Sequence, residues 1–449
     1  MNPASFQFGC KPKTRNSAAN DDFHASMLAS LPMWRHLYSI VLTALVPALV
    51  WHVIRKYRAQ GEPVHLRARL GVHPPHIPHG AIWIHACSLG EAKVALKLAE
   101  SIERQRGQST FLFTTTTPAG FAHLSDANRS PVVFPWDLPW VWDAWLRQSP
   151  SALVVIETEL WPNLIAQCQA HAVPVILANG RLSPKSYRQY QRFSRLFQPM
   201  WATLSAACMQ FAEDAARAQH LGVPRAVISE VGSIKLDQTM ALPKTAAVEA
   251  LRRQTAPRRL AVLMSSHAQD EFVILDALDW SDPEVPRLLI VPRHPHRAAD
   301  VVEVCAQRAL SAARLSEGFP ETSVDVLIGD TFGRMADYLA AADVVIIGGS
   351  FAGRGGQNPV EPASLAKPIL AGASMYNFQA ISDALETVGG LKRVHPRTLP
   401  DALIWAESSE AADGARRSQQ WIESNQGSSD RQATQILHIL RESNRSEMR

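Results

Sequence analysis

The sequence predicts an α/β protein made of two successive domains, each built around a parallel sheet. The chain has 449 residues, whereas a single domain typically has ~100–200. Short apolar runs alternate with segments of helical spacing, and this alternation starts again after Lys235. Such alternation is typical of βαβ units, in which helices connect parallel strands. We therefore expect an N-terminal domain at 81–232 and a C-terminal domain at 233–449.

The apolar runs identify the strands of both domains. In the first domain they lie at 81–86, 111–115, 131–134, 152–156 and 173–178. In the second domain they lie at 260–264, 288–291, 325–328 and 344–347. Apolar runs of this length are typical of buried strands, and the segments between them have the spacing of amphipathic helices. A last helix is expected around 430–442.

A membrane anchor is predicted before the first domain. Residues 37–54 contain no Asp, Glu, Lys or Arg, and about 17–25 apolar residues can span a bilayer. Arg55 and Lys56 follow directly, and positive charge on this flank places the later domains in the cytoplasm. A buried core helix is the alternative, and an anchor that lies in the membrane interface is equally compatible. The expected segments are a disordered leader at 1–30, an anchor helix at 31–58 and a linker at 59–80.

Composition and missing motifs exclude several classes of protein. The net charge of +4 is too small for a protein that coats nucleic acid by bulk charge. Five scattered cysteines without a C-x-x-C pair argue against a disulfide framework and against a zinc site. The chain also lacks a G-x-G-x-x-G after its first strand, a P-loop and a D-x-D. These absences argue against enzymes that depend on a dinucleotide or a metal-held nucleotide diphosphate.

The first candidate site follows the strand at 81–86. Ligands of open α/β sheets bind at the carboxyl ends of the strands, and the segment His85–Glu91 lies at such an end. Gly90 lets the backbone turn tightly and approach a substrate. Glu91 then lies in the first turn of a helix, where a carboxylate can act as a general base. Alternatively, it only stabilises the helix dipole.

Two further carboxylates follow the buried strand at 152–156. Glu157 and Glu159 stand at its carboxyl end, where they can bind the hydroxyl groups of a sugar. The alternative is that they cap a helix that begins near Pro162, because proline is favoured in a first helical turn.

A basic run completes the first domain. It contains Arg181, Lys185 and Arg188, with Tyr187 and Tyr190 among them. Basic side chains interleaved with aromatic ones can bind phosphates at an acidic lipid surface. A solvated basic helix is the alternative.

A glycine-rich loop in the second domain is a candidate anion site. Gly348 and Gly349 follow the strand at 344–347, and a helix is expected just after Gly355–Asn358. Glycines at a strand end expose backbone N–H groups, and a helix N-terminus favours an anion. Glu361, one turn into that helix, can accept hydrogen bonds from both hydroxyls of a ribose. Further candidate cations for a phosphate are Arg293 and Lys235.

Together these segments resemble the Kdo transferases, which use CMP-activated 3-deoxy-D-manno-oct-2-ulosonic acid (Kdo) to glycosylate the lipid A precursor. The motifs that carry the resemblance stand in family order. They are H-A-x-S-x-G-E at 85–91, T-T-T-T-P-x-G at 114–120, P-x-D-L-P at 135–139, E-T-E-L-W-P-N at 157–163, N-x-R-L-S at 179–183, P-R-H-P at 292–295, G-D-T-x-G at 329–333 and G-G-x-N-P-x-E-P at 355–362.

The resemblance implies a GT-B fold, in which two Rossmann-like domains enclose the active site. It implies an inverting transfer of Kdo from CMP-Kdo to the lipid A precursor at the inner membrane. It further implies that no metal, cofactor or nucleic acid takes part and that Glu91 is the catalytic base. The implied CMP-binding residues are Lys235, Arg293, His294, Gly349, Ser350, Asn358 and Glu361. The implied acceptor-side and membrane-facing residues are Ser88, Gly90, Glu157, Glu159, Arg181, Lys185 and Arg188.

Three departures from the family pattern lie at or near the donor side. Gln357 replaces a histidine, Ala268 replaces an acid and Ser233 replaces an asparagine. They leave two alternatives open. One is a GT-B paralogue with another nucleotide-sugar donor or another acceptor, and the other is a non-catalytic paralogue that binds lipid.

Overall fold

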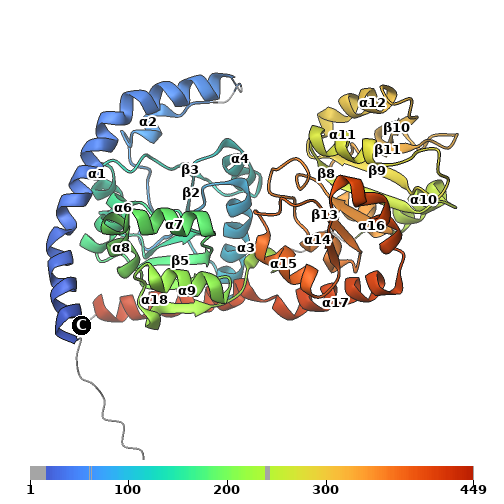
Figure 1. The fold of residues 1–449 in the computed structure, drawn as a ribbon. Helices are drawn as coiled ribbons and strands as arrows, with labels where there is room; N and C mark the ends of the chain where they lie inside the picture. Colours follow the sequence, from blue (N-terminus) through green and yellow to red (C-terminus); the bar gives the residue numbers. More distant parts are fainter. Residues whose placement is uncertain (1–16, 60, 62, 238–242, 448–449) are drawn as a thin grey trace, which may run out of the picture. The chain divides into compact units, whose positions relative to one another are not determined.

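A computed structural model of the protein describes residues 17–59, 61, 63–237 and 243–447. The chain forms two compact units (Figure 1). Unit 1 consists of Met1–Ile234 together with Ser428–Arg449, and unit 2 consists of Lys235–Gly427.

Unit 1 contains a sheet of seven parallel strands. They are β1 (Ile82–His85), β2 (Phe111–Thr115), β3 (Val132–Val133), β4 (Ala152–Ile156), β5 (Val175–Gly180), β6 (Ala206–Met209) and β7 (Ile228–Glu230). Their order across the sheet is β3-β2-β1-β4-β5-β6-β7. The five strands predicted in this domain are present. Strands β6 and β7 were not predicted, because the alanines of β6 and the three residues of the edge strand β7 give little apolar signal.

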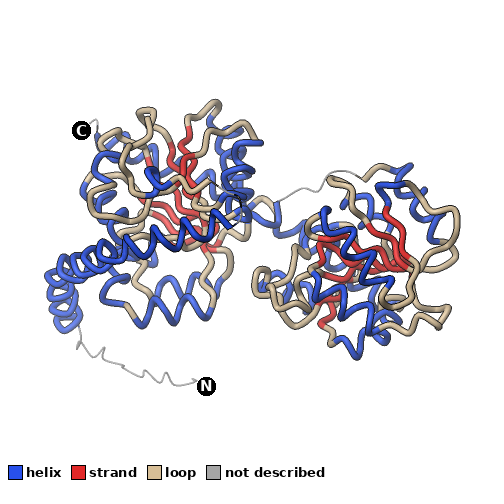
Figure 2. The backbone as a smooth tube through the Cα atoms, turned by 90° about the horizontal axis from the view of Figure 1, so that it is seen from above, coloured by secondary structure: helices blue, strands red, loops and turns tan. Residues whose placement is uncertain are grey.

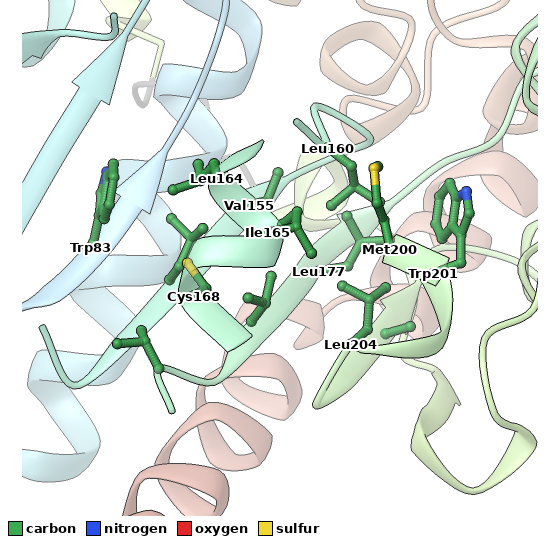
Figure 3. Packing of buried hydrophobic residues seen from close by; sticks show 14 of the residues in the cluster. Trp83, Val155, Leu160, Leu164, Ile165, Cys168, Leu177, Met200, Trp201 and Leu204 are labelled. Carbon is green, nitrogen blue, oxygen red and sulfur yellow. The ribbon is translucent and has the colours of Figure 1, made fainter. Parts of the chain in front are cut away.

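Helices cover both faces of this sheet. They are α2 (Leu66–Arg69), α3 (Leu89–Arg106), α4 (Pro118–Asp126), α5 (Trp142–Leu146), α6 (Pro162–Ala170), α7 (Pro184–Arg192), α8 (Ser194–Ala202), α9 (Ala212–His220) and α18 (Ser428–Glu447). Alternate residues of β1 point to opposite faces. Trp83 joins the cluster on one face, with Trp142 and Trp201, whereas Ile82 and Ile84 join the cluster on the other. Figure 3 shows the first cluster around Val155, Leu177 and Cys168 of β4, β5 and α6.

The C-terminal helix corrects the predicted domain boundary. We expected the second domain to continue to residue 449, but α18 returns to unit 1 and lies beside α3 (Figure 1). Its Ile436 and Leu440 are buried in the cluster that contains Ile82 and Ile84. The side-chain oxygen of Gln432 accepts a hydrogen bond from the Asn179 N–H at 2.8 Å. The apolar stripe of α18 therefore completes one face of the first sheet.

Helix α1 (Ser17–Ala59) precedes the sheet. The predicted disordered leader is thus wrong from residue 17 onward, and its remainder lies outside the described residues. Residues Met33–Ala59 are long and apolar enough to cross a membrane, by length and composition. The helix lies against α6 and α8 (Figure 1), and the Ser39 hydroxyl donates to Asn163 Oδ1 at 3.0 Å. One face of α1 therefore packs against the rest of unit 1.

The opposite face of α1 is apolar and exposed. Its exposed side chains include Met33, Leu37, Ile40, Val41, Leu45 and Trp51. The alternative of a buried core helix is therefore wrong for most of this segment. The predicted linker at 59–80 also differs from expectation, because it contains α2, and Arg69 and Ile77 in it are buried.

Unit 2 contains a second sheet of seven parallel strands, drawn in red in Figure 2. They are β8 (Leu260–Ser266), β9 (Arg287–Pro292), β10 (Ala312–Arg314), β11 (Val326–Ile328), β12 (Val344–Ile347), β13 (Ile369–Ala371) and β14 (Leu391–Arg393). Their order is β10-β11-β9-β8-β12-β13-β14. The four strands predicted in this domain are present. The three-residue strands β10, β13 and β14 were missed because they are too short to show a period.

Helices again flank the sheet. They are α10 (Thr245–Thr255), α11 (Ala268–Ala277), α12 (Ala298–Ala306), α13 (Met335–Ala341), α14 (Val360–Ser364), α15 (Gln379–Thr387), α16 (Leu399–Trp405) and α17 (Ser409–Asn425). In each sheet the order of the strands reverses beside one central strand. This switch point lies between β1 and β4 in unit 1 and between β8 and β12 in unit 2. Ligands of open α/β sheets bind at the carboxyl ends of the strands beside such a point.

Candidate active site

Glu91 lies at the switch point of unit 1, in the first turn of α3. Ser88 caps this helix, and its Oγ accepts a hydrogen bond from the Glu91 N–H at 3.3 Å. The Ser88 hydroxyl donates to Glu91 Oε1 at 2.7 Å, and the Cys87 N–H donates to Glu91 Oε2 at 2.8 Å. Both carboxylate oxygens are therefore held in place. The same bonds stabilise the start of the helix, so this alternative role is also realised.

Gly90 has a different role from the one we predicted. It lies inside α3 and does not adopt a left-handed conformation, so the expected tight turn is wrong. Gly90 is exposed, and an added Cβ would have Ser88 Oγ, 3.9 Å away, as its nearest neighbour. The space above this residue is open, which leaves room for a substrate close to Glu91.

Three carboxylates gather at this point. Burial raises the pKa of Glu91 to about 7, and the negative charges of Glu157 and Glu159 add to this effect. The hydrogen bonds from Ser88 and Cys87 act in the opposite direction, because they favour the ionised form. Burial and the charge of Glu157 also raise the pKa of Glu159. A carboxylate with a pKa near neutrality is well matched to accept a proton in a reaction at neutral pH.

We expect the rate of the reaction to rise with pH through about 7, because only the ionised form of Glu91 can take up a proton. Below that pH, kcat/KM should fall about tenfold per pH unit. A pH profile of kcat/KM with saturating donor measures this fall in rate toward acidic pH. A midpoint near the ordinary value for Glu would mean that neither burial nor the neighbouring acids raise the pKa of the base.

The segment after β4 places Glu157 and Glu159 without using them as caps. Helix α6 begins at Pro162 with Trp161 as its N-cap, and the Asp137 carboxylate accepts from the N–H groups of Asn163 at 2.8 Å and Leu164 at 2.9 Å in its first turn. The capping alternative for these two acids is therefore wrong. Glu157 has a left-handed backbone, with φ at 62°, which non-glycine residues adopt mainly at functional sites or tight turns.

The basic run forms a solvated helix beside this segment. Helix α7 is described in full and has no buried side chain, and both Lys185 and Arg188 are exposed. Arg181 is half-buried, and its charge acts on Asp214. The Tyr190 hydroxyl donates to the Thr158 carbonyl at 2.9 Å. The basic helix is thus attached to the segment that carries the acids, while a role in lipid binding stays a prediction.

In unit 2, a buried aspartate holds the loop at the switch point. Asp270 Oδ2 accepts from the N–H groups of His267 at 2.9 Å and Gly349 at 2.7 Å. Asp270 Oδ1 accepts from those of Phe351 at 3.1 Å and Ala352 at 2.9 Å. The loop N–H groups that we expected to face a phosphate are therefore taken by a carboxylate of the protein itself.

Ser350 takes part in the same loop. Its side chain is buried, its hydroxyl donates to the Ile347 carbonyl at 2.5 Å, and its Oγ accepts from the Gly372 N–H at 2.8 Å. The hydroxyl of Ser350 and the N–H of Gly349 thus have partners within the protein, and CMP binding by these two residues stays a prediction. Both groups fix the shape of the loop between β12 and α14.

Positively charged and polar side chains surround this loop. Arg293 and His294 are exposed after β9. Burial lowers the pKa of His267, and the positive charges of Arg354, His294 and Arg293 lower it further. Arg293 and Arg354 thus bring two fixed positive charges close to His267, an arrangement suited to a phosphate or carboxylate. His267 and Arg354 were not predicted, although His267 directly follows β8 and Arg354 lies in the loop after β12.

The remaining candidates lie elsewhere in unit 2. Lys235 Nζ lies 5.4 Å from the centroid of the Phe378 ring. Asn358 Nδ2 donates to Glu361 Oε1 at 3.2 Å. Helix α14 has only five residues, so it offers a weaker dipole than the sequence suggested. In the part of the chain that the structure describes, no group of three His, Cys, Asp or Glu could hold a metal ion. The expectation of a metal-free reaction stays a prediction.

Replacing Glu361 by Ala should weaken CMP binding by roughly ten- to a hundredfold, since each charge-assisted hydrogen bond to a ribose hydroxyl contributes about 1.5–3 kcal/mol. The 2′-deoxy nucleotide should bind the parent weakly but lose little further affinity in the variant. Calorimetric titration of both nucleotides into both proteins measures these differences. Equal discrimination by parent and variant would mean that Glu361 only stabilises its helix, an effect of ~0.3–1 kcal/mol.

A family model and two relatives that match this chain have the same description. The family described as 3-deoxy-D-manno-octulosonic-acid transferase (kdotransferase) matches residues 64–238. A 3-deoxy-D-manno-octulosonic acid transferase from Bordetella pertussis is 32% identical over 395 residues, which cover 83% of this chain and 91% of the relative. One from Haemophilus influenzae is 30% identical over 388 residues, which cover 83% of this chain and 89% of the relative.

The solved structures agree with the fold. The structure of Anabaena HepE in complex with UDP matches with a TM-score of 0.54 at 14% identity. The match covers 80% of this chain and 99% of that protein. With two parallel seven-stranded sheets, the chain has the predicted GT-B fold. It belongs to the 3-deoxy-D-manno-octulosonic acid transferase family.

Proposed function

We propose that this protein transfers Kdo from CMP-Kdo to the lipid A precursor with inversion at the anomeric carbon. The observation that carries the proposal is Glu91, which the Cys87 N–H and the Ser88 hydroxyl hold at the switch point of unit 1. Its pKa of about 7 suits a general base. The names of the relatives support Kdo as the sugar.

The proposed reaction is a single displacement. Glu91 accepts the proton of an acceptor hydroxyl while the oxygen forms a bond to the anomeric carbon of Kdo. The bond from that carbon to the phosphate oxygen breaks, and CMP leaves with the electron pair. Cations stabilise charge that develops on a leaving phosphate, and we assign this role to Arg293 and Arg354. The proton then rests on the Glu91 carboxyl and passes to solvent.

A transfer assay with matched donors tests the proposal. Purified protein is incubated with the lipid A precursor and either CMP-Kdo or a UDP-sugar. The molecular mass of the lipid product is then measured by mass spectrometry. We expect a mass increase of one or more Kdo units with CMP-Kdo only. Turnover with a UDP-sugar would favour the paralogue with another donor. Binding of lipid without turnover on any donor would favour the non-catalytic paralogue.

We further propose that α1 lies in the membrane interface instead of crossing the bilayer. The contacts of α1 with unit 1 extend from Ser39, which donates to Asn163, to Tyr57, which donates to the Thr116 carbonyl. These 18 steps along the helix span about 27 Å at ~1.5 Å per residue, close to the ~30 Å of a hydrocarbon core. A helix packed against a folded unit over this length presents only its outer face to lipid.

Replacing Leu37, Val41 and Leu45 together by Gln should release the protein from vesicles. Each of these outer-face side chains is about half exposed, and burying one in lipid stabilises binding by about 1.5–3 kcal/mol. We expect partitioning into vesicles to fall by roughly a hundredfold or more. The control Leu42→Gln changes the face that packs on unit 1, so it should lower stability but not vesicle binding. Equal release by both variants would indicate a helix surrounded by lipid.

A further inference from the structure

We infer that the last turn of α1 positions the catalytic base, through a chain of hydrogen bonds from Tyr57 and Arg69 to the turn that carries Glu91. This inference rests on the proposed function and deepens it. It makes Tyr57, Arg69 and Thr116 positioning residues, and it makes the anchor helix a part of the catalytic unit rather than only a tether.

The chain of bonds begins at a single backbone carbonyl. The Tyr57 hydroxyl donates to the Thr116 carbonyl at 3.3 Å, and Arg69 Nη2 donates to the same carbonyl at 3.2 Å. Arg69 Nη2 also donates to the Tyr57 oxygen at 2.9 Å. These three groups close a triangle between α1, α2 and the segment after β2. The position of Thr116 is therefore set by the end of the anchor helix.

Thr116 in turn holds the backbone of the turn before α3 through contacts with Cys87. Its hydroxyl donates to the Cys87 carbonyl at 3.0 Å, and Cys87 Sγ lies 2.8 Å from Thr116 Oγ1. Since the threonine proton is used by the carbonyl, the thiol is the donor in the second contact. Burial raises the pKa of the Cys87 thiol to about 12, which keeps that proton in place. The Cys87 N–H in turn donates to Glu91 Oε2 at 2.8 Å.

Tyr57 and Arg69 are buried, which indicates that their geometry is fixed by the surrounding structure. Tyr57 and Arg69 are each only 6% exposed. The guanidinium lies 4.9 Å from the centre of the Tyr57 ring, and its Nε donates to the Val64 carbonyl at 3.1 Å. Among the described residues, no carboxylate lies within ion-pair distance of Arg69. A buried cation without an ion-pair partner is costly unless hydrogen bonds fix it.

The charge of Arg69 also suits a place near the base. Its positive charge and the negative charges of Glu91 and Glu159 all act on the Cys87 thiol. Arg69 therefore lies near the same thiol as Glu91 and Glu159. If α1 only packed against the rest of unit 1, a tyrosine contact would be enough. A buried cation beside the acids would not be needed.

A pair of matched variants of the full chain separates positioning from docking. Tyr57→Phe keeps the ring and removes only the hydroxyl. The control Tyr38→Phe makes the same change on the same helix, where the hydroxyl bonds to Asp137, whose carboxylate caps the start of α6. A misplacement of ~1 Å can lower a rate by ~10²-fold, so we expect kcat to fall about tenfold in Tyr57→Phe. In Tyr38→Phe, kcat should stay within twofold, and CMP affinity should be unchanged in both.

A second measurement does not need turnover. Hydrogen exchange of the segment 86–92 should be faster in Tyr57→Phe than in Tyr38→Phe and the parent, because the turn that holds the Cys87 N–H against Glu91 is then less firmly fixed. If the parent transferred no Kdo, the proposed function would fail while this exchange result still tested the inference. Arg69→Lys keeps the charge but removes the planar guanidinium with its several N–H donors, and it should show the same faster exchange. Equal exchange and equal kcat in the two tyrosine variants would overturn the inference.

Discussion

Replacing Glu91 by Gln is expected to lower kcat by at least two orders of magnitude, because a general base of this kind contributes ~10²–10⁴-fold. The amide has nearly the shape of the carboxylate but cannot accept a proton at neutral pH. Its oxygen can still accept from the Cys87 N–H, while the Ser88 hydroxyl can turn to accept from the amide NH₂. The fold and the affinity for CMP should therefore be preserved.

Single-turnover transfer and calorimetric titration of CMP together measure this effect. Glu103→Gln is a suitable control, since Glu103 lies on the same helix and pairs with Arg129 at the surface. We expect the control to transfer Kdo at the rate of the parent. Activity of Glu91→Gln within tenfold of the parent would remove Glu91 from the role of base.

Replacing Asp270 by Asn should weaken CMP binding by roughly a hundredfold. The carboxylate accepts four N–H groups, two at each oxygen. An amide keeps only one acceptor oxygen and turns its NH₂ toward the other two donors. Two buried N–H groups then lose their partners at about 1–3 kcal/mol each, and ~1.4 kcal/mol corresponds to tenfold in affinity. The loop between β12 and α14 should rearrange to satisfy them.

Titration of CMP into the variant measures this loss. Asp276→Asn is the matched control, because Asp276 lies on the same helix α11 but pairs with Arg308 at the surface. Asp270→Glu should retain more affinity than Asp270→Asn, since it keeps four acceptor lone pairs. Unchanged CMP affinity in Asp270→Asn would mean that the loop held by Asp270 does not contact the nucleotide.

Local pattern was enough to predict the framework of this protein. The apolar runs at β1, β4, β8 and β12 are central strands that are buried on both faces, and such strands are readable as continuous apolar segments. Glu91 follows β1 by a short turn, so its place at the carboxyl edge of the sheet was also predictable. The apolar stretch in α1 was equally clear, because its hydropathy depends on composition alone.

The partners of these residues could not be read from local pattern. Whether a loop N–H faces a ligand or a carboxylate depends on Asp270, 79 residues before Gly349. The return of α18 to unit 1 and the burial of Arg69 beside Tyr57 are contacts of the same long-range kind.

The sequence by itself determined which segments become strands and helices, and which residues stand at the strand ends, because both follow from periodicity along the chain. Only the tertiary structure decided which face of α1 is left for lipid and which donors already have acceptors. It also decided which side chains support Glu91. These outcomes depend on packing between segments that are distant in sequence, and no local period encodes that packing.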